Sequence, residues 1–206
     1  MLNIVGCSVV AWDPSGLIFA VSLYRQCSIL LYDTKEFDKA PFMTFVIYDK
    51  ELEKISYPPP SPQPVSLKFS TDGAYLLVGT TTVYNYILDS FTGQIYYRLE
   101  GHEPIHRPHG SPNPSREELS WTPDSKYVVG GSSDGRILIW EIPSIDNKPS
   151  QIKTLHPISS YNAYKGPVSI VNFNPKYTVM TTASDNVLSL WLPSMDSRRN
   201  EDEILK

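Results

Sequence analysis

The pattern that decides the fold is Ser132-Ser133-Asp134-Gly135-Arg136-Ile137-Leu138-Ile139-Trp140. A tight turn at Asp134-Gly135 leads into an apolar strand, and the strand closes on Trp140. Glycine and asparagine tolerate the positive φ of a tight hairpin turn. The stretch Ala183-Ser184-Asp185-Asn186-Val187-Leu188-Ser189-Leu190-Trp191 has the same layout, with Asn186 in the place of Gly135. The two stretches therefore indicate one hairpin unit that is used twice.

The same unit extends along the whole chain in four copies. Each copy has an apolar strand that ends at a turn, a second strand, a tight turn, and a third strand that closes on an aromatic or apolar residue. The copies cover residues 9–33, 65–89, 118–141 and 168–191, with the anchors Trp12, Phe69, Trp121 and Phe173. The anchors recur at about fifty residues, which is longer than the roughly 40 to 45 residues usual for a repeat of four strands, so the connections between copies carry insertions.

The composition agrees with many short strands. Of the 206 residues 41% are apolar and 12% aromatic, and 18 prolines interrupt the chain. β-Branched residues cluster between turn formers, which favours strands over helices. Because side chains alternate between the two faces of a strand, one sheet cannot bury both of its faces alone. Each copy must pack against a neighbour, which predicts an all-β propeller with about four consecutive blades.

Charge and cysteine content limit the classes of function. The net charge is −4 and no basic block occurs, which argues against binding nucleic acid through phosphate contacts. Cys7 and Cys27 are too few for a disulfide framework and lack zinc-knuckle spacing, which favours a reducing compartment. Residues 2–6 do not have the charge or length of a signal peptide, and no apolar run reaches membrane-spanning length. We therefore expect no direct nucleic-acid or membrane contacts.

The Asp-to-Trp hairpin, with Gly101-His102 before it, resembles the WD-repeat family. Blades of that family use an Asp of the turn, a Ser or Thr of the middle strand, a Trp of the third strand and a His as a buried hydrogen-bonded set. A buried carboxylate and a buried indole N–H both need partners. The resemblance implies a structural set in the third copy and part of one in the fourth, made of His102, Ser132, Asp134, Trp140, Asp185 and Trp191.

Two copies depart from this pattern. Ala163-Tyr164 stands where the fourth copy would have Gly-His, and Thr80-Thr81-Thr82 stands where the second copy would have its Asp turn. Degeneracy of this kind is ordinary in the family. We expect these two blades to be held mainly by packing.

Longer stretches resemble one family within the WD-repeat proteins, the WD repeat-containing protein 82 type subunit of the COMPASS histone-lysine methyltransferase complex. They are residues 13–20, 31–33, 37–42, 44–45, 121–125, 173–176 and 191–193. The stretch 37–45 and the Trp-Leu-Pro of 191–193 are not demanded by a generic blade, so they discriminate between families. In fungi the counterpart also belongs to the cleavage and polyadenylation machinery.

The resemblance implies a nuclear, non-catalytic scaffold whose partners are subunits of a SET-domain methyltransferase complex. The resemblance also implies subunits of the cleavage and polyadenylation factor as further partners, in mRNA 3′-end processing and transcription termination. Which of these roles dominates stays open. The alternatives are a generic WD-repeat adaptor, such as a substrate receptor of a ubiquitin ligase, and a truncated product without function.

An enzyme built on a propeller is a further alternative, but the sequence has none of the common catalytic motifs. There is no Gly-x-Ser-x-Gly elbow, no His-Glu-x-x-His, no Walker loop and no Gly-x-Gly-x-x-Gly. Asp134 and Asp185 look like paired carboxylates, but their fixed relation to Trp140 and Trp191 already has a structural explanation in the repeat. We therefore assign no catalytic, cofactor-binding or metal-binding residues.

The family forms a seven-bladed ring, and this chain aligns with the second half of it. We expect blades over residues 1–195, with repeats near 8–48, 64–100, 117–156 and 167–193, and a polar tail over 196–206. An open half-ring exposes a blade face and a strand edge, which favours self-pairing. The chain is therefore expected to be a fragment, a shortened gene product or half of a dimer.

The loop after His102 is the first candidate for partner binding. It contains His106, Arg107 and His109, and clustered histidines suggest a metal site. Prolines interrupt the segment and no Cys lies nearby, so we expect no metal there. An exposed insertion is a common place for partner contacts.

The proline-rich stretch 57–64 is the second candidate. Pro58, Pro59 and Pro60 give it the composition of a polyproline II segment, which docks on aromatic grooves. The favoured alternative is a stiff link between two blades, because proline-rich stretches commonly act as spacers.

Overall fold

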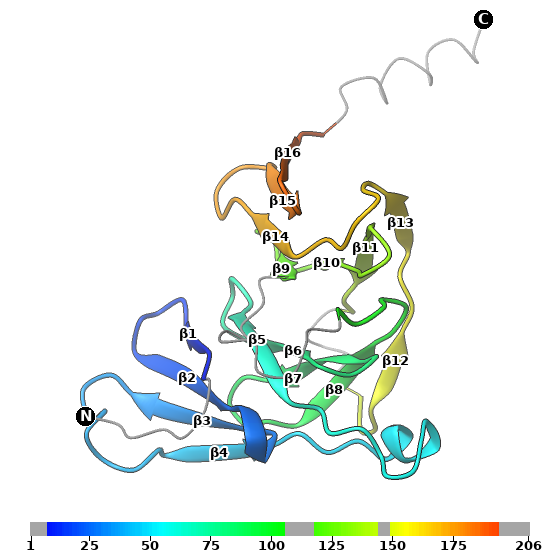
Figure 1. The fold of residues 1–206 in the computed structure, drawn as a ribbon. Helices are drawn as coiled ribbons and strands as arrows, with labels where there is room; N and C mark the ends of the chain where they lie inside the picture. The colour runs from blue at the N-terminus through cyan, green and yellow to red at the C-terminus, as the bar shows by residue number, and fades with distance from the viewer. Residues whose placement is uncertain (1–7, 106–117, 144–148, 194–206) are drawn as a thin grey trace, which may run out of the picture.

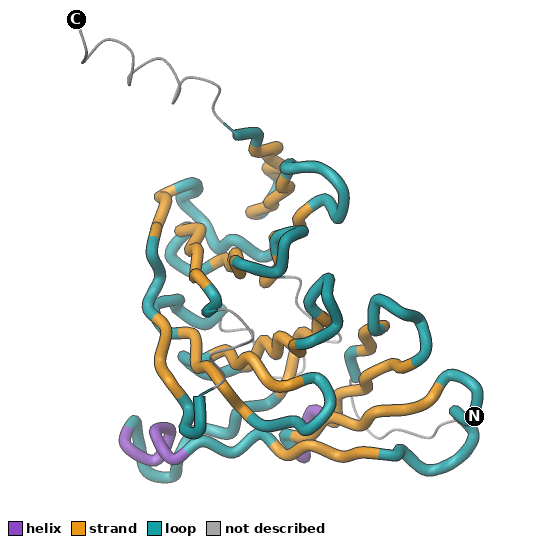
Figure 2. Tube along the Cα trace, turned by 180° about the vertical axis from the view of Figure 1, so that it is seen from behind, coloured by secondary structure: helices purple, strands orange, loops and turns teal. Residues whose placement is uncertain are grey.

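The computed structural model describes residues 8–105, 118–143 and 149–193, whose regular secondary structure is almost entirely β-strand. Two short 3-10 segments, η1 (Tyr24–Gln26) and η2 (Lys50–Lys54), are the only helices in these three ranges. The strands form four sheets that follow one another along an arc in sequence order (Figure 1, Figure 2). The predicted all-β fold with about four blades is confirmed.

Each sheet is one blade, built mainly from consecutive antiparallel strands. Blade 1 contains β1 (Val10–Trp12), β2 (Ile18–Leu23), β3 (Ser28–Asp33) and β4 (Met43–Val46). Blade 2 contains β5 (Pro64–Phe69), β6 (Tyr75–Thr80), β7 (Asn85–Asp89), β8 (Ile95–Leu99) and, at its outer edge, β12 (Lys153–Leu155). Blade 3 contains β9 (Leu119–Trp121), β10 (Tyr127–Gly131), β11 (Arg136–Glu141) and β13 (Ser159–Asn162). Blade 4 contains β14 (Ile170–Phe173), β15 (Met180–Ser184) and β16 (Val187–Trp191).

Alternation along each strand divides the apolar side chains between two interblade cores. On β6, Leu76 and Val78 join the core shared with blade 1, whereas Tyr75 and Leu77 join the core shared with blade 3. A third core, around Val129, joins blade 3 to blade 4. Full burial of one such side chain contributes roughly 1.5–3 kcal/mol. The blades are therefore held to one another mainly by these three cores.

The innermost strands β1, β5, β9 and β14 lie next to one another and add polar contacts between blades. Trp121, the last residue of β9, donates its indole N–H to the backbone carbonyl of Lys68 on β5 over 3.1 Å. Phe173 occupies the same place on β14, and its backbone N–H donates to the hydroxyl of Ser120 over 3.0 Å. The aromatic anchor of a blade thus contacts the inner strand of the blade before it.

The outer edge of blades 2 and 3 differs from the expected repeat over residues 117–156. Residues 153–155 form β12, which pairs in parallel with β8 of blade 2. The outer strand of blade 3 is β13, which pairs with β11 and begins only at Ser159. A backbone hydrogen bond of 3.1 Å from Glu100 to Leu155 fixes the extra strand. The chain therefore crosses to the neighbouring blade before it completes its own.

Candidate functional site

The residues of the expected polar set of blade 3 are His102, Ser132, Asp134 and Trp140. In the structure Trp140, Ser132 and His102 bond to different partners. Trp140 is fully buried on β11, and its indole N–H donates to the backbone carbonyl of Glu100 over 2.9 Å. Ser132 is buried in the turn after β10 and accepts from the backbone N–H of Glu103 over 2.9 Å. Beside the Trp140 ring lies Gly130, where an added Cβ would be 2.8 Å from ring atom Cζ3. Trp140 therefore bonds to backbone, because no hydroxyl lies beside its ring on β10.

Asp134, expected to be a buried carboxylate, lies exposed at the tip of the turn. It pairs with the guanidinium of Arg136, whose Nη2 donates to the carbonyl of Gly101 over 3.1 Å. Partial burial raises the pKa of Asp134, but hydrogen bonds from Ser132 and Arg136 outweigh this effect and hold it below its ordinary value. The carboxylate thus ties the turn to the segment that enters blade 3.

His102 is buried, as the resemblance implied, and it contacts blade 2. Its Nε2 lies 3.3 Å from the side-chain nitrogen of Asn85 on β7. Asn85 also accepts from the backbone N–H of Thr80 over 2.9 Å, and the hydroxyls of Thr80 and Thr82 lie 2.8 Å apart. Hydrogen bonds therefore close the turn of blade 2, in addition to the packing that was expected to hold it.

Blade 4 has a polar set that the sequence did not indicate. Trp191 donates its indole N–H to the hydroxyl of Thr182 over 2.7 Å, and the phenol of Tyr164 lies 2.6 Å from the same hydroxyl. Thr182 is fully buried on β15. Tyr164, which stands where a His was expected, thus supplies a polar partner, so hydrogen bonds add to the packing that holds this blade. Asp185 is exposed in the turn of the β15–β16 hairpin, with a φ of 48°.

A buried ion pair in blade 2 was also missed. Two of the three guanidinium nitrogens of Arg98 on β8, Nε and Nη2, donate to the carboxylate of Asp49 over 2.6 and 2.5 Å. The phenol of Tyr86 donates to Asp49 over 3.2 Å, and Arg98 also donates to Thr154 of β12 over 2.8 Å. Asp49 caps η2 by accepting from the backbone N–H of Glu51. One ion pair therefore connects the segment after blade 1 with both outer strands of blade 2.

The environment of this pair favours its charged form. Burial raises the pKa of Asp49, but hydrogen bonds from Arg98, from the backbone and from Tyr86 outweigh it, so the pKa lies below its ordinary value. Burial and the negative charge of Asp49 both raise the pKa of Tyr86, so the phenol stays protonated. Arg98 is the only charged residue in the apolar strand Ile95–Leu99. This single arginine was the signal in the sequence for a buried ion-pair partner.

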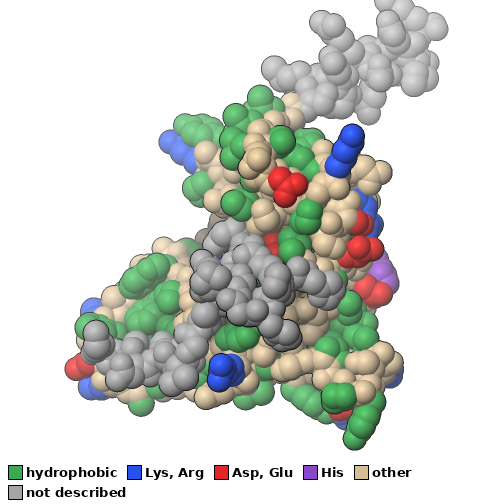
Figure 3. All heavy atoms as spheres, in the orientation of Figure 1, with side chains coloured by type: hydrophobic (Ala, Val, Ile, Leu, Met, Phe, Trp, Pro, Cys, Tyr) green, Lys and Arg blue, Asp and Glu red, His purple; other side chains and the backbone are tan. Residues whose placement is uncertain are grey.

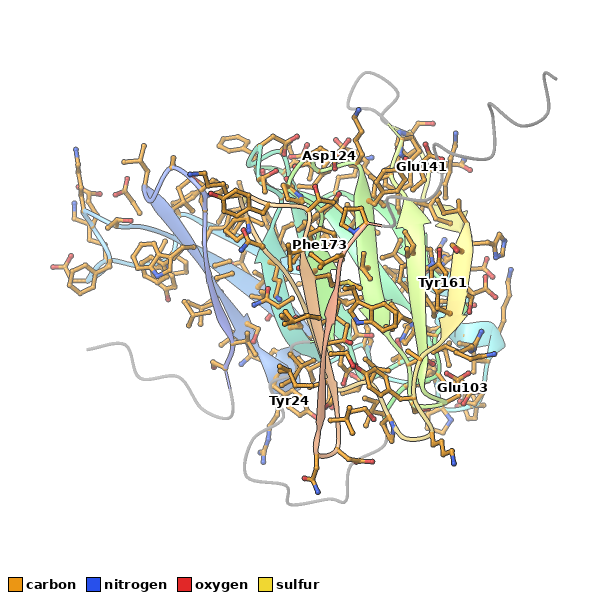
Figure 4. The ribbon with its side chains drawn as sticks, turned by 90° about the horizontal axis from the view of Figure 1, so that it is seen from above. Tyr24, Glu103, Asp124, Glu141, Tyr161 and Phe173 are labelled. Atoms are coloured by element: carbon orange, nitrogen blue, oxygen red, sulfur yellow. The ribbon has the colours of Figure 1, made fainter. Side chains whose placement is uncertain are left out.

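The turns of the blades gather at two rims. Figure 4 places Tyr24 and Glu103 on one rim and Asp124 and Glu141 on the opposite one. On the first rim, Gly135 has a φ of +86°, and an added Cβ would lie 2.1 Å from the carbonyl oxygen of Tyr164. This close approach holds the turn of blade 3 against the segment that enters blade 4. This part of the rim carries the charged side chains of Glu103, Asp134 and Arg136.

The loop after His102 was the first candidate for partner binding in the sequence. Its residues His106, Arg107 and His109 lie outside the described residues. Elsewhere, the described ranges contain no cluster of three or more His, Cys, Asp or Glu side chains arranged to hold a metal ion. Among the same residues there is also no helix with the length and apolar character needed to cross a membrane.

The proline segment is fixed at one end and exposed at the other. Pro58 and Pro59 are exposed and Pro60 is half-buried, while the Tyr57 side chain before them is 99% exposed. The next residue, Ser61, contacts both neighbouring blades, through the thiol of Cys27 at 2.9 Å and the hydroxyl of Thr81 at 3.2 Å. Figure 3 shows apolar side chains at the corner where Figure 1 places the connection from β4 to β5. The contacts of Ser61 with both blades agree with a spacer between them. The exposed residues 57–59 agree with a contact surface.

Comparisons with known proteins agree with this architecture. The family profile described as WD domain, G-beta repeat matches residues 93–141 and 155–191. WD repeat-containing protein 82 of Drosophila melanogaster is 34% identical over 95% of this chain and 53% of its own length. COMPASS component SWD2 of Saccharomyces cerevisiae is 35% identical over 86% of this chain and 50% of its own length. The chain thus spans about half the length of these relatives.

Two further comparisons concern the wider family and the fold. Set1 complex component swd2 of Schizosaccharomyces pombe is 24% identical over 91% of this chain and 58% of its own length. A chain in the crystal structure of the mitotic checkpoint complex superposes with a TM-score of 0.62, at 17% identity, over 91% of this chain and 49% of that chain. At that identity the second likeness concerns the fold alone.

Proposed function

This chain is a WD-repeat protein, and on that premise we propose that it is a non-catalytic adaptor subunit of a nuclear, COMPASS-like histone-lysine methyltransferase complex. Its partners are subunits that accompany a SET-domain methyltransferase. A second role, in mRNA 3′-end processing and transcription termination, involves subunits of the cleavage and polyadenylation factor. The similarity to a COMPASS component and to a Set1 complex component supports the first role.

The observation that carries the proposal is the exposure of Phe37 and Phe42. Both lie in the β3–β4 connection, inside the stretch 37–45 that distinguishes the COMPASS-type family from a generic blade. Their side chains are 52% and 46% exposed, whereas Phe45 of the same stretch is 4% exposed in the core with blade 2. Phe45 therefore has a role in packing, but Phe37 and Phe42 are available to a partner. Exposed aromatic residues of this kind are common anchors of protein interfaces.

Two other surfaces extend the proposed contact area. The exposed side chains of Tyr57, Pro58 and Pro59 project from the connection between blades 1 and 2. Proline-rich segments present a preformed shape that aromatic grooves on partner proteins recognise. The rim around Glu103 and Arg136 offers charged groups, and charge complementarity mainly sets orientation and specificity.

Affinity purification of the tagged full chain from nuclear extract, followed by mass spectrometry, tests the proposal. Subunits of a SET-domain methyltransferase complex are expected with the unchanged chain and are lost with the double variant Phe37→Ser, Phe42→Ser. The control is Tyr161→Ser, because Tyr161 is 53% exposed on β13 of another blade. The control variant should recover the same subunits. Recovery of cullin adaptors instead, as a ubiquitin-ligase receptor would give, overturns the proposal.

A further inference from the structure

The outer edge of blade 2 is covered by a strand from a later part of the chain. β8 is the fourth strand of this blade, and all five of its residues are buried. β12 lies against β8, and the chain reaches this position only after it has formed β9, β10 and β11 of blade 3. The chain then returns to blade 3 as β13 (Figure 1). Residues 152–155, which include β12, are called the strap below.

The strap is attached to blade 2 by a short pairing. β12 has three residues and pairs with Tyr97, Arg98 and Leu99 of β8. Within the described residues this pairing stops short of Ile95 and Tyr96, the first two residues of β8. It is also the only parallel pairing among the described strands. Because parallel pairing is slightly less stable per residue, the strap is held less firmly than the antiparallel strands of the blade.

The side chains of the strap show which chemistry the edge of β8 accepts. Ile152 packs against the core between blades 1 and 2, and Leu155 packs against the core between blades 2 and 3. Between them, the hydroxyl of Thr154 accepts from Nη1 of Arg98 over 2.8 Å. Lys153 is exposed. The edge therefore accepts an extended segment with the order apolar residue, any residue, Ser or Thr, apolar residue.

The polar position of this edge is built by groups outside the strap. Two nitrogens of Arg98 donate to Asp49, and its guanidinium carbon lies 5.0 Å from the centre of the Tyr84 ring. These contacts keep the guanidinium in place when Thr154 leaves. Nη1 of Arg98 then needs a new acceptor, because buried donors are almost always hydrogen-bonded. The edge thus offers a preformed donor to an incoming hydroxyl.

We propose that the edge of β8 is a binding site for an extended segment of a partner protein, and that the strap blocks this site until it is displaced. The incoming segment adds to blade 2 as a parallel strand, and its Ser or Thr hydroxyl accepts from Arg98. In this mode of recognition main-chain hydrogen bonds supply affinity, and alternate side chains supply specificity. A segment longer than the strap also pairs beside Ile95 and Tyr96. The site requires only this side-chain order, so the inference does not depend on the proposed function.

Fluorescence anisotropy with a labelled peptide of residues 150–157 tests the site on the purified full chain. The first variant combines Ile152→Gly, Thr154→Gly and Leu155→Gly, which removes the side chains that hold the strap. A closed strap lowers the apparent affinity by the fraction of chains that are open, so this variant should bind the peptide about tenfold more tightly than the unchanged chain. A peptide that carries Thr154→Val should lose most of this gain, because it gives Arg98 no acceptor.

The matched control is Tyr161→Gly, which weakens β13, the outer strand of blade 3, but leaves the strap in place. It should bind the peptide as weakly as the unchanged chain. A scrambled peptide of the same composition should bind to none of the proteins. Equal binding of the scrambled peptide, or equal binding of the peptide to the strap variant and to the Tyr161→Gly control, overturns the proposal.

A milder variant keeps the test decisive if circular dichroism shows that the triple glycine variant does not fold. Thr154→Val in the full chain keeps a β-branched residue in the strap and removes only the acceptor for Arg98. The loosened strap should raise the affinity for the labelled peptide above that of the unchanged chain. A folded Thr154→Val protein that binds the peptide no more tightly than the unchanged chain overturns the proposal.

Discussion

Trp191 donates its indole N–H to the hydroxyl of Thr182, which is fully buried, over 2.7 Å. The phenol of Tyr164 lies 2.6 Å from the same hydroxyl. One threonine therefore joins the third strand of blade 4, its middle strand and the segment that enters it. This arrangement explains how the blade is ordered without the histidine that its sequence lacks.

Replacement of Thr182 should destabilise the protein. Thr182→Val keeps the volume but leaves the indole N–H of Trp191 without its acceptor, which costs about 1–3 kcal/mol. The phenol of Tyr164 keeps the backbone carbonyl of residue 182 at 3.2 Å. Urea unfolding followed by tryptophan fluorescence measures the change in free energy of unfolding. Thr92→Val, on an exposed turn of blade 2, is the control and should stay within about 0.5 kcal/mol of the unchanged chain. Equal effects of the two substitutions would contradict the role of the shared hydroxyl.

The Asp49–Arg98 pair should couple strongly. Arg98→Met leaves the Asp49 carboxylate buried and uncompensated, with an expected loss of about 3–5 kcal/mol of stability. Adding Asp49→Asn to that variant removes the unpaired charge, so the double variant should be less destabilised than the sum of the two single changes. A double-mutant cycle by chemical denaturation measures this coupling. Additive losses would mean that the two side chains do not act as a pair.

The same pair predicts a pH dependence. The folded pKa of Asp49 lies below its unfolded value of about 3.9, so its contribution to stability is present above that pH. The contribution is lost as the pH falls through the folded pKa. The difference in unfolding free energy between the unchanged chain and Asp49→Asn should be constant near neutral pH and shrink below about pH 4. Asp124 and Asp134, whose pKa values are also lowered, cancel in this difference because both proteins retain them. A difference that grows on acidification would contradict the assignment.

Gly93 should tolerate no side chain. It has a φ of +70°, and an added Cβ would lie 2.0 Å from the ring of Phe45, across the contact between blades 1 and 2. Gly93→Ala should lose about 1 kcal/mol from the left-handed backbone and a further 1–3 kcal/mol, roughly, from overpacking. Gly16→Ala is the matched control, since Gly16 has a φ of +72° with no atom within 4 Å of the added Cβ. Thermal unfolding compares the two, and equal losses would exclude the packing effect.

The blades follow from local patterns in the sequence. Strands alternate with a period of two, and each hairpin has its turn residues at fixed offsets, so the four copies and their aromatic anchors were visible without any structure. Trp12, Trp121 and Phe173 occupy equivalent places at the ends of their inner strands, as the repeat predicted. The resemblance to WD-repeat proteins rested on these same short segments.

The polar partners were not predictable in the same way, because they join residues that are distant in sequence. Trp140 bonds to a carbonyl 40 residues earlier, and Arg98 to a carboxylate 49 residues earlier. Such a pairing depends on which atoms two blades bring within hydrogen-bond distance, and that distance depends on interblade packing.

The sequence by itself determined that the chain forms successive blades, because each blade is specified by neighbours along the strand. Only the tertiary structure decided that the phenol of Tyr164 bonds to Thr182 and that β12 completes the outer edge of a neighbouring blade. It also decided how two equivalent anchors differ in burial, since Trp121 is 5% exposed and Trp12 58% exposed in this structure. The physical reason is that a hydrogen-bond donor or an apolar face takes whatever partner the packed blades place beside it.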